Sequence, residues 1–476
     1  MKKILILETY PFSPHLETSG EIAITFKEKY KCEVYFGWLG QNLEWAEWHL
    51  SKIKFFFYSY ERRIKVFTEI LEKKKINNIK IKNYRLPESE IDKWSKNFNG
   101  DVYDLKKYLF RKHQLGIGAA SSLISYLQES SPCLIKHKNL AIKLLTDSAK
   151  IFLIAQKIIK FIKPDLVITF NGRFATSRAI SEAAKTCKVK IKYHERGSSF
   201  KKYEIFDDNL HSSNYRKKNI DNYWKRGCKK KYLIAKSFYE KSKSGKRKNY
   251  LGLSFSNNNK FPKIKNNQKQ FIYTYFASTS YEWDAILGYK KGNWKNEYDA
   301  IKNLILEIKK LRVDIKLIVR LHPFNKLLKN YKDLNNIKDL CKKNNILLFD
   351  ELSKINSYKL IKKSNAIITY GSTIGAEAIY MNKPTITMRE SFYSNSKNVY
   401  YALNLNQLRK VILKYNLKKK DDKSVLPFAY YMMTFGKNFN HYNAINYKKG
   451  LFCENNLSIL RPFFKSISEF INFLKN

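Results

Sequence analysis

The feature that most constrains the fold is a regular alternation of short apolar runs with amphipathic segments in the second half of the chain. Apolar runs bounded by turn residues are typical of buried strands, and apolar residues spaced by three or four predict helices between them. Strands that alternate with helices pair in parallel through right-handed crossovers, which produces a doubly wound α/β sheet. The strands that we expect are Phe271–Phe276, Ile315–Leu321, Ile346–Phe349, Ala366–Tyr370 and Thr385–Met388.

The first half shows the same alternation less regularly. A β-α-β unit is predicted from a strand at Asp165–Phe170, a helix at Arg173–Thr186 and a strand at Val189–His194. Before it, Lys3–Glu8 reads as a strand and Ser19–Tyr30 as a helix. At 476 residues the chain is too long for one ordinary core. We therefore expect two Rossmann-like α/β domains.

Composition limits the classes of protein to consider. The chain is 44% hydrophobic and 15% aromatic, which is typical of a globular protein. Its net charge of +50 has two interpretations: a basic surface for nucleic acid, anionic membrane or anionic substrate, or a bias towards Lys, Asn and Ile along the whole chain. The six cysteines contain no CxxC pair, so we expect no zinc site and a reducing cytoplasm. No segment looks like a membrane span, and peripheral attachment through basic residues stays open.

Three polar clusters in the second half follow predicted strands, where open parallel sheets bind ligands. The first contains Ser278, and the second contains Arg320 and His322, whose alternation directs both to one side of the strand. The third starts a helix, where glycine permits a sharp turn and Ser372 or Thr373 can cap the helix and leave amides for a phosphate. Its residues are Gly371, Ser372, Thr373, Gly375 and Glu377. An ordinary capped helix and a lone strand-end histidine are the alternatives.

Further candidates lie in the first half. Asn171, Gly172 and Arg173 follow one strand, and Glu195 and Arg196 follow the next. Glu195 is the carboxylate that we choose for catalysis, and an ion pair with Arg196 or Arg173 is the structural alternative. A third cluster has His15 and Glu17 in a proline-containing loop that Thr18 or Ser19 can cap, and these two residues could meet an acceptor sugar.

These clusters together resemble a known family. Arg320-Leu-His322-Pro323, then Tyr370-Gly-Ser-Thr-Ile-Gly-Ala-Glu377-Ala and Asn382-Lys-Pro384, look like the donor-domain signature of bacterial capsule and surface-polysaccharide glycosyltransferases. That group has the GT-B fold and includes the retaining Kdo transferases. Asn171-Gly-Arg173, Glu195-Arg-Gly197 and Pro14-His15-Leu-Glu17 are similar to members of the group. Sugar-nucleotide 2-epimerases share the fold, but their corresponding helix start has more glycines and paired glutamates.

The resemblance implies two Rossmann-like domains that face each other across a cleft. Residues 1–240 would form the acceptor-side domain, with a helical insertion at about 46–130. The break to a polar, lysine-rich composition at 241–270 predicts a linker. It would lead to a nucleotide-sugar-binding domain at 271–430, and 431–476 would pack back on the first domain. The resemblance implies a nucleotide held by His322, Ser372 and Thr373 with Glu377 near the ribose. The partners would be a CMP-Kdo-type or UDP-sugar donor and a saccharide or glycolipid acceptor, and we expect no metal, no cofactor and no nucleic acid.

Two other functions fit part of the pattern. Teichoic-acid-type polyol-phosphate transferases also use an Arg-x-His-Pro element on a GT-B frame. A non-catalytic polysaccharide- or nucleic-acid-binding protein would keep the fold without the chemistry. The chain has no zinc pattern and no short module of concentrated charge, which counts against nucleic-acid binding.

Overall fold

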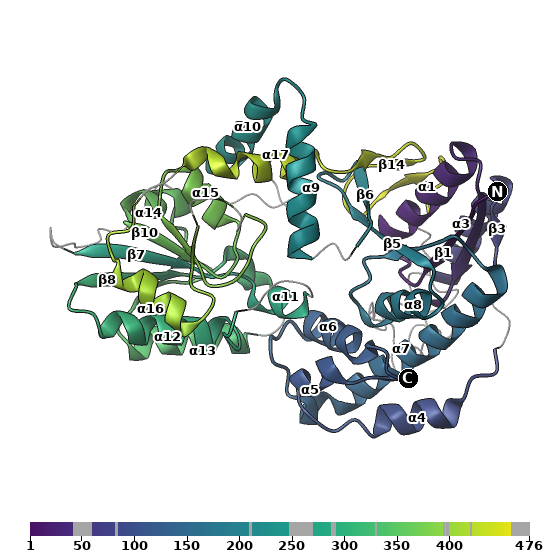
Figure 1. Cartoon of the computed structure of the whole chain (residues 1–476), viewed down its shortest axis with the longest axis horizontal. Helices are drawn as coiled ribbons and strands as arrows, with labels where there is room; N and C mark the ends of the chain where they lie inside the picture. Colours follow the sequence, from purple (N-terminus) through teal and green to yellow (C-terminus); the bar gives the residue numbers. More distant parts are fainter. Residues whose placement is uncertain are drawn as a thin grey trace, which may run out of the picture. The chain divides into compact units, whose positions relative to one another are not determined.

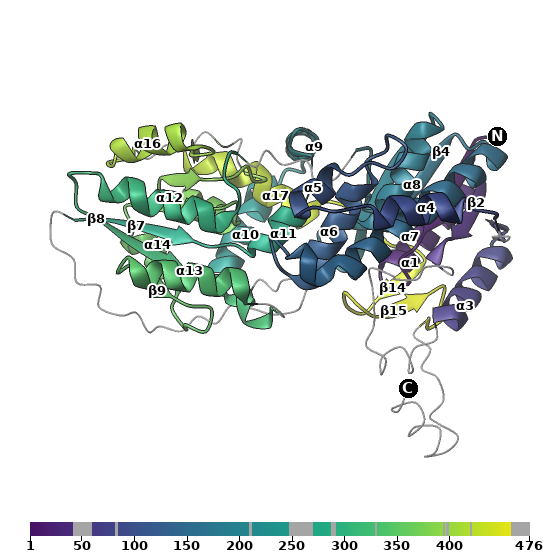
Figure 2. The same cartoon turned by 90° about the horizontal axis from the view of Figure 1, so that it is seen from below.

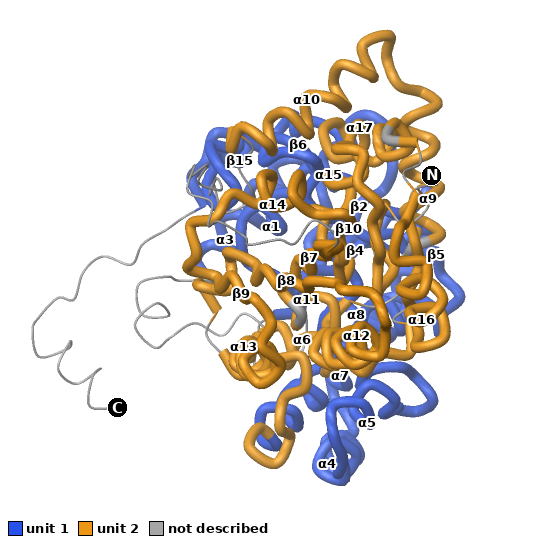
Figure 3. The backbone as a smooth tube through the Cα atoms, turned by 90° about the vertical axis from the view of Figure 1, so that its left-hand side faces the viewer, with its two compact units in different colours: residues 1–119, 138–207, 436–476 blue, residues 120–137, 208–435 orange. Residues whose placement is uncertain are grey.

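The computed structural model describes residues 1–40, 60–80, 84–208, 212–246, 270–286, 292–328, 331–393, 396, 399–418 and 421–457. It divides the chain into two compact units, which Figure 3 colours separately. Unit 1 comprises residues 1–119, 138–207 and 436–476, and unit 2 comprises residues 120–137 and 208–435. Both units are built on a mainly parallel sheet with helices on both faces, so the expected α/β fold class is confirmed.

The sheet of unit 2 has six parallel strands in the order β12-β11-β10-β7-β8-β9. The order reverses between β7 and β10, as it does in doubly wound Rossmann-like sheets. The strands are β7 (Phe271–Phe276), β8 (Ile315–Arg320), β9 (Leu347–Phe349), β10 (Ala366–Thr369), β11 (Thr385–Thr387) and β12 (Val399–Tyr401).

Alternate side chains of these strands point to opposite faces of the sheet and pack in two separate hydrophobic cores. Tyr273 and Tyr275 pack with helices α12, α13 and α16 on one face. Ile272 and Phe276 pack with α14 and α15 on the other face, and Figure 2 shows α12 and α16 on the opposite side of β7 from α14. The helices of unit 2 are α9 (Ser213–Lys225), α10 (Lys231–Lys243), α11 (Ser280–Ala285), α12 (Glu297–Lys309), α13 (Lys332–Lys343), α14 (Ser357–Lys363), α15 (Ile374–Tyr380), α16 (Leu405–Leu413) and α17 (Leu426–Thr434), with 3-10 turns η2 (Pro323–Leu327) and η3 (Asp422–Val425).

The sheet of unit 1 has the order β13-β6-β5-β4-β1-β2-β3. The five strands β3, β2, β1, β4 and β5 are parallel. Next to β5, β6 pairs antiparallel with β5, and β13 pairs antiparallel with β6. The order again reverses at one place, between β1 and β4. The strands of this unit are β1 (Lys3–Glu8), β2 (Glu33–Trp38), β3 (Asn77–Asn78), β4 (Leu166–Phe170), β5 (Lys190–Arg196), β6 (Lys202–Phe206) and β13 (Lys437–Asn438), with a separate hairpin of β14 (Tyr442–Ala444) and β15 (Gly450–Phe452).

Helices cover both faces of this sheet as well. Ile4 and Ile6 of β1 pack with α1, α3 and the β14–β15 hairpin, whereas Leu5 and Leu7 pack with α7 and α8. The helices are α1 (His15–Glu28), α3 (Tyr60–Lys73), α4 (Glu88–Lys96), α5 (Val102–Lys107), α6 (Leu115–Leu127), α7 (Leu134–Ile162) and α8 (Ala175–Thr186); the last residues of α6 and the first of α7 belong to unit 2.

Several expected boundaries differ from the structure. α1 begins at His15 after Pro14, so Thr18 and Ser19 lie inside the helix and cap nothing at its start. β5 extends to Arg196 because it pairs with β6, so Glu195 and Arg196 lie within the strand and not after it. Thr373 precedes α15 without a side-chain capping bond.

The division into units also differs from the expected domains. Residues 208–240 cluster with unit 2, because α9 and α10 pack on α17. Residues 241–243, expected to begin the linker, close α10, and most of the linker, 247–269, lies outside the described residues. β13 pairs with β6 in unit 1, and the helix expected at Ile467–Leu474 lies outside the described residues. Within the described residues, no helix combines the length and apolar character that a bilayer-spanning segment needs.

Candidate functional site

The three polar clusters expected in the second half of the chain all lie at the carboxyl ends of strands in the unit 2 sheet. β10, β7 and β8 are neighbours, and their registers align Thr369 with Phe276 and Phe276 with Arg320. Ser278, His322 and Gly371 therefore all follow the carboxyl ends of adjacent strands. The crevice between β7 and β10 is the switch point of the sheet, where ligands of Rossmann-like domains bind.

Two glycines in the third cluster meet specific structural demands. Gly371 has a φ of +87°, a left-handed conformation that costs other residues energy. A Cβ on Gly375 would overlap the Tyr393 hydroxyl, so Tyr393 would have to move to make room for any other side chain. That hydroxyl donates a hydrogen bond to the Ser372 carbonyl oxygen at 2.8 Å. Gly375 thus lets Tyr393 pack against α15 and hold the turn that leads out of β10.

The two residues of the second cluster, Arg320 and His322, differ in what their side chains contact. Arg320 is 3% exposed, and its guanidinium donates to the carbonyl oxygens of Asp350 and Ser353. These contacts hold the loop after β9 and indicate a structural role for Arg320. His322 follows β8, and its Nδ1 accepts a hydrogen bond from the Phe324 amide at 3.2 Å. Burial, supported by the charge of Arg320, lowers the pKa of His322 to about 4, so its imidazole is neutral at pH 7.

Ser278 and Glu377 are both engaged by partners that the sequence did not indicate. The Ser278 amide and hydroxyl donate to the two carboxylate oxygens of Glu297, at 2.9 and 3.0 Å. Glu377 accepts a hydrogen bond from the Tyr358 hydroxyl. It also lines a pocket of about 280 Å³ between α10, α14 and α15, together with Tyr239 and Lys362. Ser278 is thus held by Glu297, whereas Glu377 borders a pocket that a ligand could fill.

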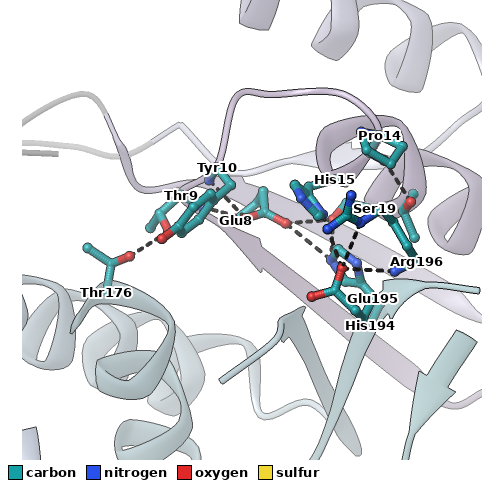
Figure 4. Close-up of polar contacts among 11 residues, drawn as sticks. Glu8, Thr9, Tyr10, Pro14, His15, Ser19, Thr176, His194, Glu195 and Arg196 are labelled. Carbon is teal, nitrogen blue, oxygen red and sulfur yellow. Dashed lines mark hydrogen bonds and ion pairs between the residues drawn. The ribbon is translucent and has the colours of Figure 1, made fainter. Parts of the chain in front are cut away.

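In unit 1, the loop after β1 is organised by a buried carboxylate (Figure 4). Glu8, Ser19 and His194 are all fully buried. Glu8 accepts hydrogen bonds from the amides of Thr9 and Tyr10 at 2.8 and 2.9 Å and from the Ser19 hydroxyl at 2.8 Å. His194 Nε2 lies 2.9 Å from Ser19 Oγ and 3.2 Å from Glu8 Oε2. This cluster joins β1, α1 and β5 at the unit 1 switch point.

Glu195 lies beside this cluster, next to His15 and Arg196 (Figure 4), and it is met by groups from three parts of unit 1. Its Oε2 accepts a hydrogen bond from Asn171 Nδ2 at 2.7 Å. Its Oε1 accepts one from the Arg196 amide at 3.0 Å and lies 4.0 Å from His15 Nδ1. The side chains of His15 and Glu195 are 15% and 17% exposed, so both are partly accessible. The structure thus brings together His15, Asn171 and the adjacent pair Glu195 and Arg196, which come from three separate parts of the sequence.

The remaining candidates of unit 1 lie differently. Glu17 is 1% exposed and forms a buried ion pair with Arg63, which indicates a structural role. The Arg173 guanidinium stacks over the Phe174 ring at 4.2 Å. Gly172 forms the turn out of β4 with a φ of +72°. The ion pair that we weighed for Glu195 forms with Arg196, whose Nε lies 3.5 Å from Oε1.

The charge states of the Glu195 pair follow from its surroundings. Burial lowers the pKa of His15 to about 3; Glu195 opposes this shift, and Arg196 and His194 add to it. Burial acts to raise the pKa of Glu195, but His15, Arg196 and hydrogen bonds from the Arg196 amide and Asn171 outweigh it and lower the pKa to about 2. At neutral pH the pair is therefore a carboxylate beside a neutral imidazole.

The lowered pKa of His15 predicts an acid-sensitive fold. Between pH 6.5 and 3 the unfolded chain binds a proton at His15 that the folded chain does not, so stability falls as pH falls through this window. Relative to wild type, a His15→Gln variant should lose less unfolding free energy between pH 7 and 5, by on the order of 1–2 kcal/mol. Urea unfolding at both pH values measures this difference, and equal losses in the two proteins would contradict it.

Some residues at the two sites gave little signal in the sequence. Arg389 is fully buried just beyond β11, and its guanidinium lies 5.2 Å from the Trp283 ring centre. Glu8 ends a predicted strand, so its position could have singled it out. Glu297 and Tyr358 lie on helices and carried no motif.

The described residues hold no group of three or more His, Cys, Asp or Glu side chains arranged to bind a metal ion.

Comparison with known proteins adds one family and several structures. The sequence model of the UDP-N-acetylglucosamine 2-epimerase family matches residues 286–395, which include His322 and the Gly371–Glu377 cluster. No curated protein sequence matches the chain.

Three solved structures illustrate the similarity. S. aureus MnaA, determined with UDP, has 13% identity and a TM-score of 0.26 over 92% of each chain. The KpsC β-Kdo 2,4 transferase of Thermosulfurimonas dismutans has 10% identity and a TM-score of 0.35 over 56% of this chain and 79% of its own. The Methanocaldococcus jannaschii UDP-GlcNAc 2-epimerase, with UDP-GlcNAc and UDP, has 14% identity and a TM-score of 0.28 over 90% of this chain and 98% of its own. At these TM-scores, the assignment of the fold rests on the strand order of the two sheets.

Proposed function

We propose that this chain is a glycosyltransferase that moves a sugar from a nucleotide-sugar donor to a saccharide or glycolipid acceptor of a surface polysaccharide. The observation that carries the proposal is the placement of candidate residues at the switch points of both sheets. His322 and Gly371 follow β8 and β10 in unit 2, and Asn171 and Glu195 meet beyond β4 in unit 1. Both are positions where Rossmann-like sheets bind ligands.

Unit 2 would bind the nucleotide. The left-handed turn at Gly371 lets the backbone approach a phosphate, and the neutral His322 imidazole can donate a hydrogen bond to a phosphate oxygen. Glu377 lines a pocket and would accept hydrogen bonds from ribose hydroxyls. We propose that the departing nucleotide is stabilised by these groups and by the buried cation Arg389, without a metal ion.

Unit 1 would supply the carboxylate of the reaction. Glu195 is ionised at neutral pH, and its carboxylate is held by Asn171 and Arg196. A carboxylate with a pKa of about 2 is a weak proton acceptor, whereas it accepts hydrogen bonds well. Glu195 therefore fits best as the group that orients an acceptor hydroxyl and stabilises positive charge on the donor sugar, with the neutral His15 beside it.

A panel of nucleotides tests the proposal at its first step. CMP, UDP, GDP and CDP would each be added to the protein in thermal-shift measurements. A nucleotide at about 100 times its dissociation constant stabilises the folded state by about 2.7 kcal/mol. The family match to a UDP-sugar enzyme favours UDP as the nucleotide that raises Tm. If none of the four raises Tm, the donor site is assigned wrongly.

Variants of the nucleotide site sharpen this test. His322→Ala and Ser372→Ala should each weaken binding of the stabilising nucleotide by about 1–3 kcal/mol, because each removes one contact to the ligand. Calorimetric titration measures the affinity. Lys302→Ala, on the exposed side of α12, serves as the control and should bind normally. Unchanged affinity in both site variants would contradict the assignment.

Epimerisation is a second candidate function, favoured by the family match over residues 286–395. The sequence favours this activity less, because Glu377 is flanked by Ala376 and Ala378 and not by a second glutamate. The two functions differ in what they need. An epimerase converts UDP-GlcNAc to its C2 epimer without an acceptor, whereas a transferase releases the nucleotide rapidly only when an acceptor is present. Proton NMR of the protein with UDP-GlcNAc alone distinguishes them.

A further inference from the structure

The turn between α9 and α10 exposes two large apolar side chains. Tyr232 is 52% exposed and Leu233 is 68% exposed, both in the first turn of α10. On the other side of this helix, Ala235, Phe238 and Tyr239 are buried in a core shared with α17. Figures 1 and 3 show the turn at the outer edge of unit 2. The packing of α10 thus leaves Tyr232 and Leu233 facing solvent.

Basic side chains surround these two residues. Residues 222–239 contain no Asp or Glu, and five of their basic side chains are exposed. The exposed basic residues are Lys225, Arg226, Lys229, Lys230 and Lys236. Lysines at a helix N-terminus oppose the helix dipole, and the first turn of α10 has no acidic residue to balance them. A negatively charged partner would relieve this repulsion.

The turn itself is well packed. Lys231 Nζ donates a hydrogen bond to the Trp224 carbonyl oxygen at 3.1 Å and lies 4.8 Å from the centre of the Trp224 ring. The Trp224 ring also meets the Tyr232 ring edge-on at 5.0 Å between centroids. These contacts fix the orientation of α10 relative to α9. The exposed residues are therefore presented by an ordered turn.

We propose that the α9–α10 turn docks the protein on an anionic lipid bilayer. Lysine and arginine attract anionic headgroups, and an aromatic and an aliphatic side chain at the tip enter the interfacial layer. A nucleic acid would satisfy the charges but offers no apolar medium to Leu233. The proposal goes beyond the proposed function and does not depend on it, because it involves no residue of either candidate site.

Vesicle sedimentation of the full chain provides the test. The probes are phosphatidylcholine vesicles, with and without about 30% phosphatidylglycerol. The protein should sediment with the anionic vesicles only, and about 0.5 M NaCl should weaken binding at least tenfold because salt screens the charges. Lys229→Glu/Lys230→Glu should lower the affinity tenfold or more, and Leu233→Ser should lower it several-fold.

Two control variants isolate the turn. Lys342→Glu/Lys343→Glu makes the same change of charge on exposed residues of α13, and Leu352→Ser removes a leucine that is 67% exposed beside Asp350 and Glu351. Both should bind vesicles as wild type does. The proposal is overturned if wild type does not sediment with anionic vesicles, or if Lys342→Glu/Lys343→Glu reduces binding as much as Lys229→Glu/Lys230→Glu. It is also overturned if Lys229→Glu/Lys230→Glu abolishes binding to a DNA duplex while vesicle binding is unchanged.

Discussion

Replacing Glu195 by glutamine should lower turnover of the donor by about 100-fold or more while leaving nucleotide affinity unchanged. The Glu195→Gln substitution keeps the shape of the side chain and the contact with Asn171, but it removes the negative charge that His15 and Arg196 surround. The nucleotide contacts lie in unit 2, so they should be unaffected. Turnover is measured as acceptor-dependent nucleotide release, and affinity is measured by calorimetry.

The control for this experiment is Glu28→Gln, because the Glu28 side chain is 47% exposed at the end of α1 and forms a solvent-exposed ion pair with Lys74 at 3.2 Å. This variant should have wild-type turnover. If Glu195→Gln also has full turnover, Glu195 is a structural residue, and the catalytic role would move to His15. A fall in nucleotide affinity together with turnover would instead indicate that the substitution disturbs the fold.

Replacing Glu8 by alanine should destabilise the protein by about 3–5 kcal/mol, the largest effect on stability that we expect. Glu8 is fully buried, and its carboxylate accepts hydrogen bonds from two amides and from Ser19 and lies within hydrogen-bonding distance of His194. Removing the acceptor leaves these donors buried and unsatisfied, which costs more than the hydrogen bonds contributed. Urea unfolding followed by circular dichroism measures the change.

Two further variants make this result specific. Glu8→Gln keeps one acceptor oxygen for the Thr9 and Tyr10 amides but presents a donor to Ser19 and His194, so its loss should be smaller than that of Glu8→Ala. Glu28→Ala removes an exposed carboxylate and should change stability by less than about 1 kcal/mol. Equal losses for Glu8→Ala and Glu28→Ala would show that the buried cluster contributes little.

The placement of individual candidates shows where sequence reasoning succeeds. His322 and Gly371 each follow an apolar run bounded by a turn, and the parallel sheet implied by the alternation put both at one edge. Arg320 fits the same pattern, but the structure turns its guanidinium to the Asp350 and Ser353 carbonyl oxygens. A strand pattern predicts which end of the sheet a residue occupies, but it does not predict which neighbour its side chain meets.

The units of the structure differ from the expected domain limits for a related reason. The expected domain limit at residue 240 followed the change to a polar, lysine-rich composition. α9 and α10 instead belong to unit 2, because Phe238 and Tyr239 pack against α17, which lies far along the chain. Composition reports where a chain is polar. Membership of a unit depends on long-range packing that leaves no local signal.

The sequence by itself determined most strands of the two parallel sheets and the fold class, because the periods of apolar residues and the strand-end turns are local properties. It also predicted which polar residues lie near strand ends in each half of the chain. Only the tertiary structure decided which side chains these residues meet. It joined His194 to Glu8 across 186 residues and Glu195 to Asn171 across 24, and it engaged Ser278 with Glu297 and Glu17 with Arg63. These pairings depend on sheet register and helix packing, which bring distant residues within hydrogen-bonding distance only after the whole core has formed.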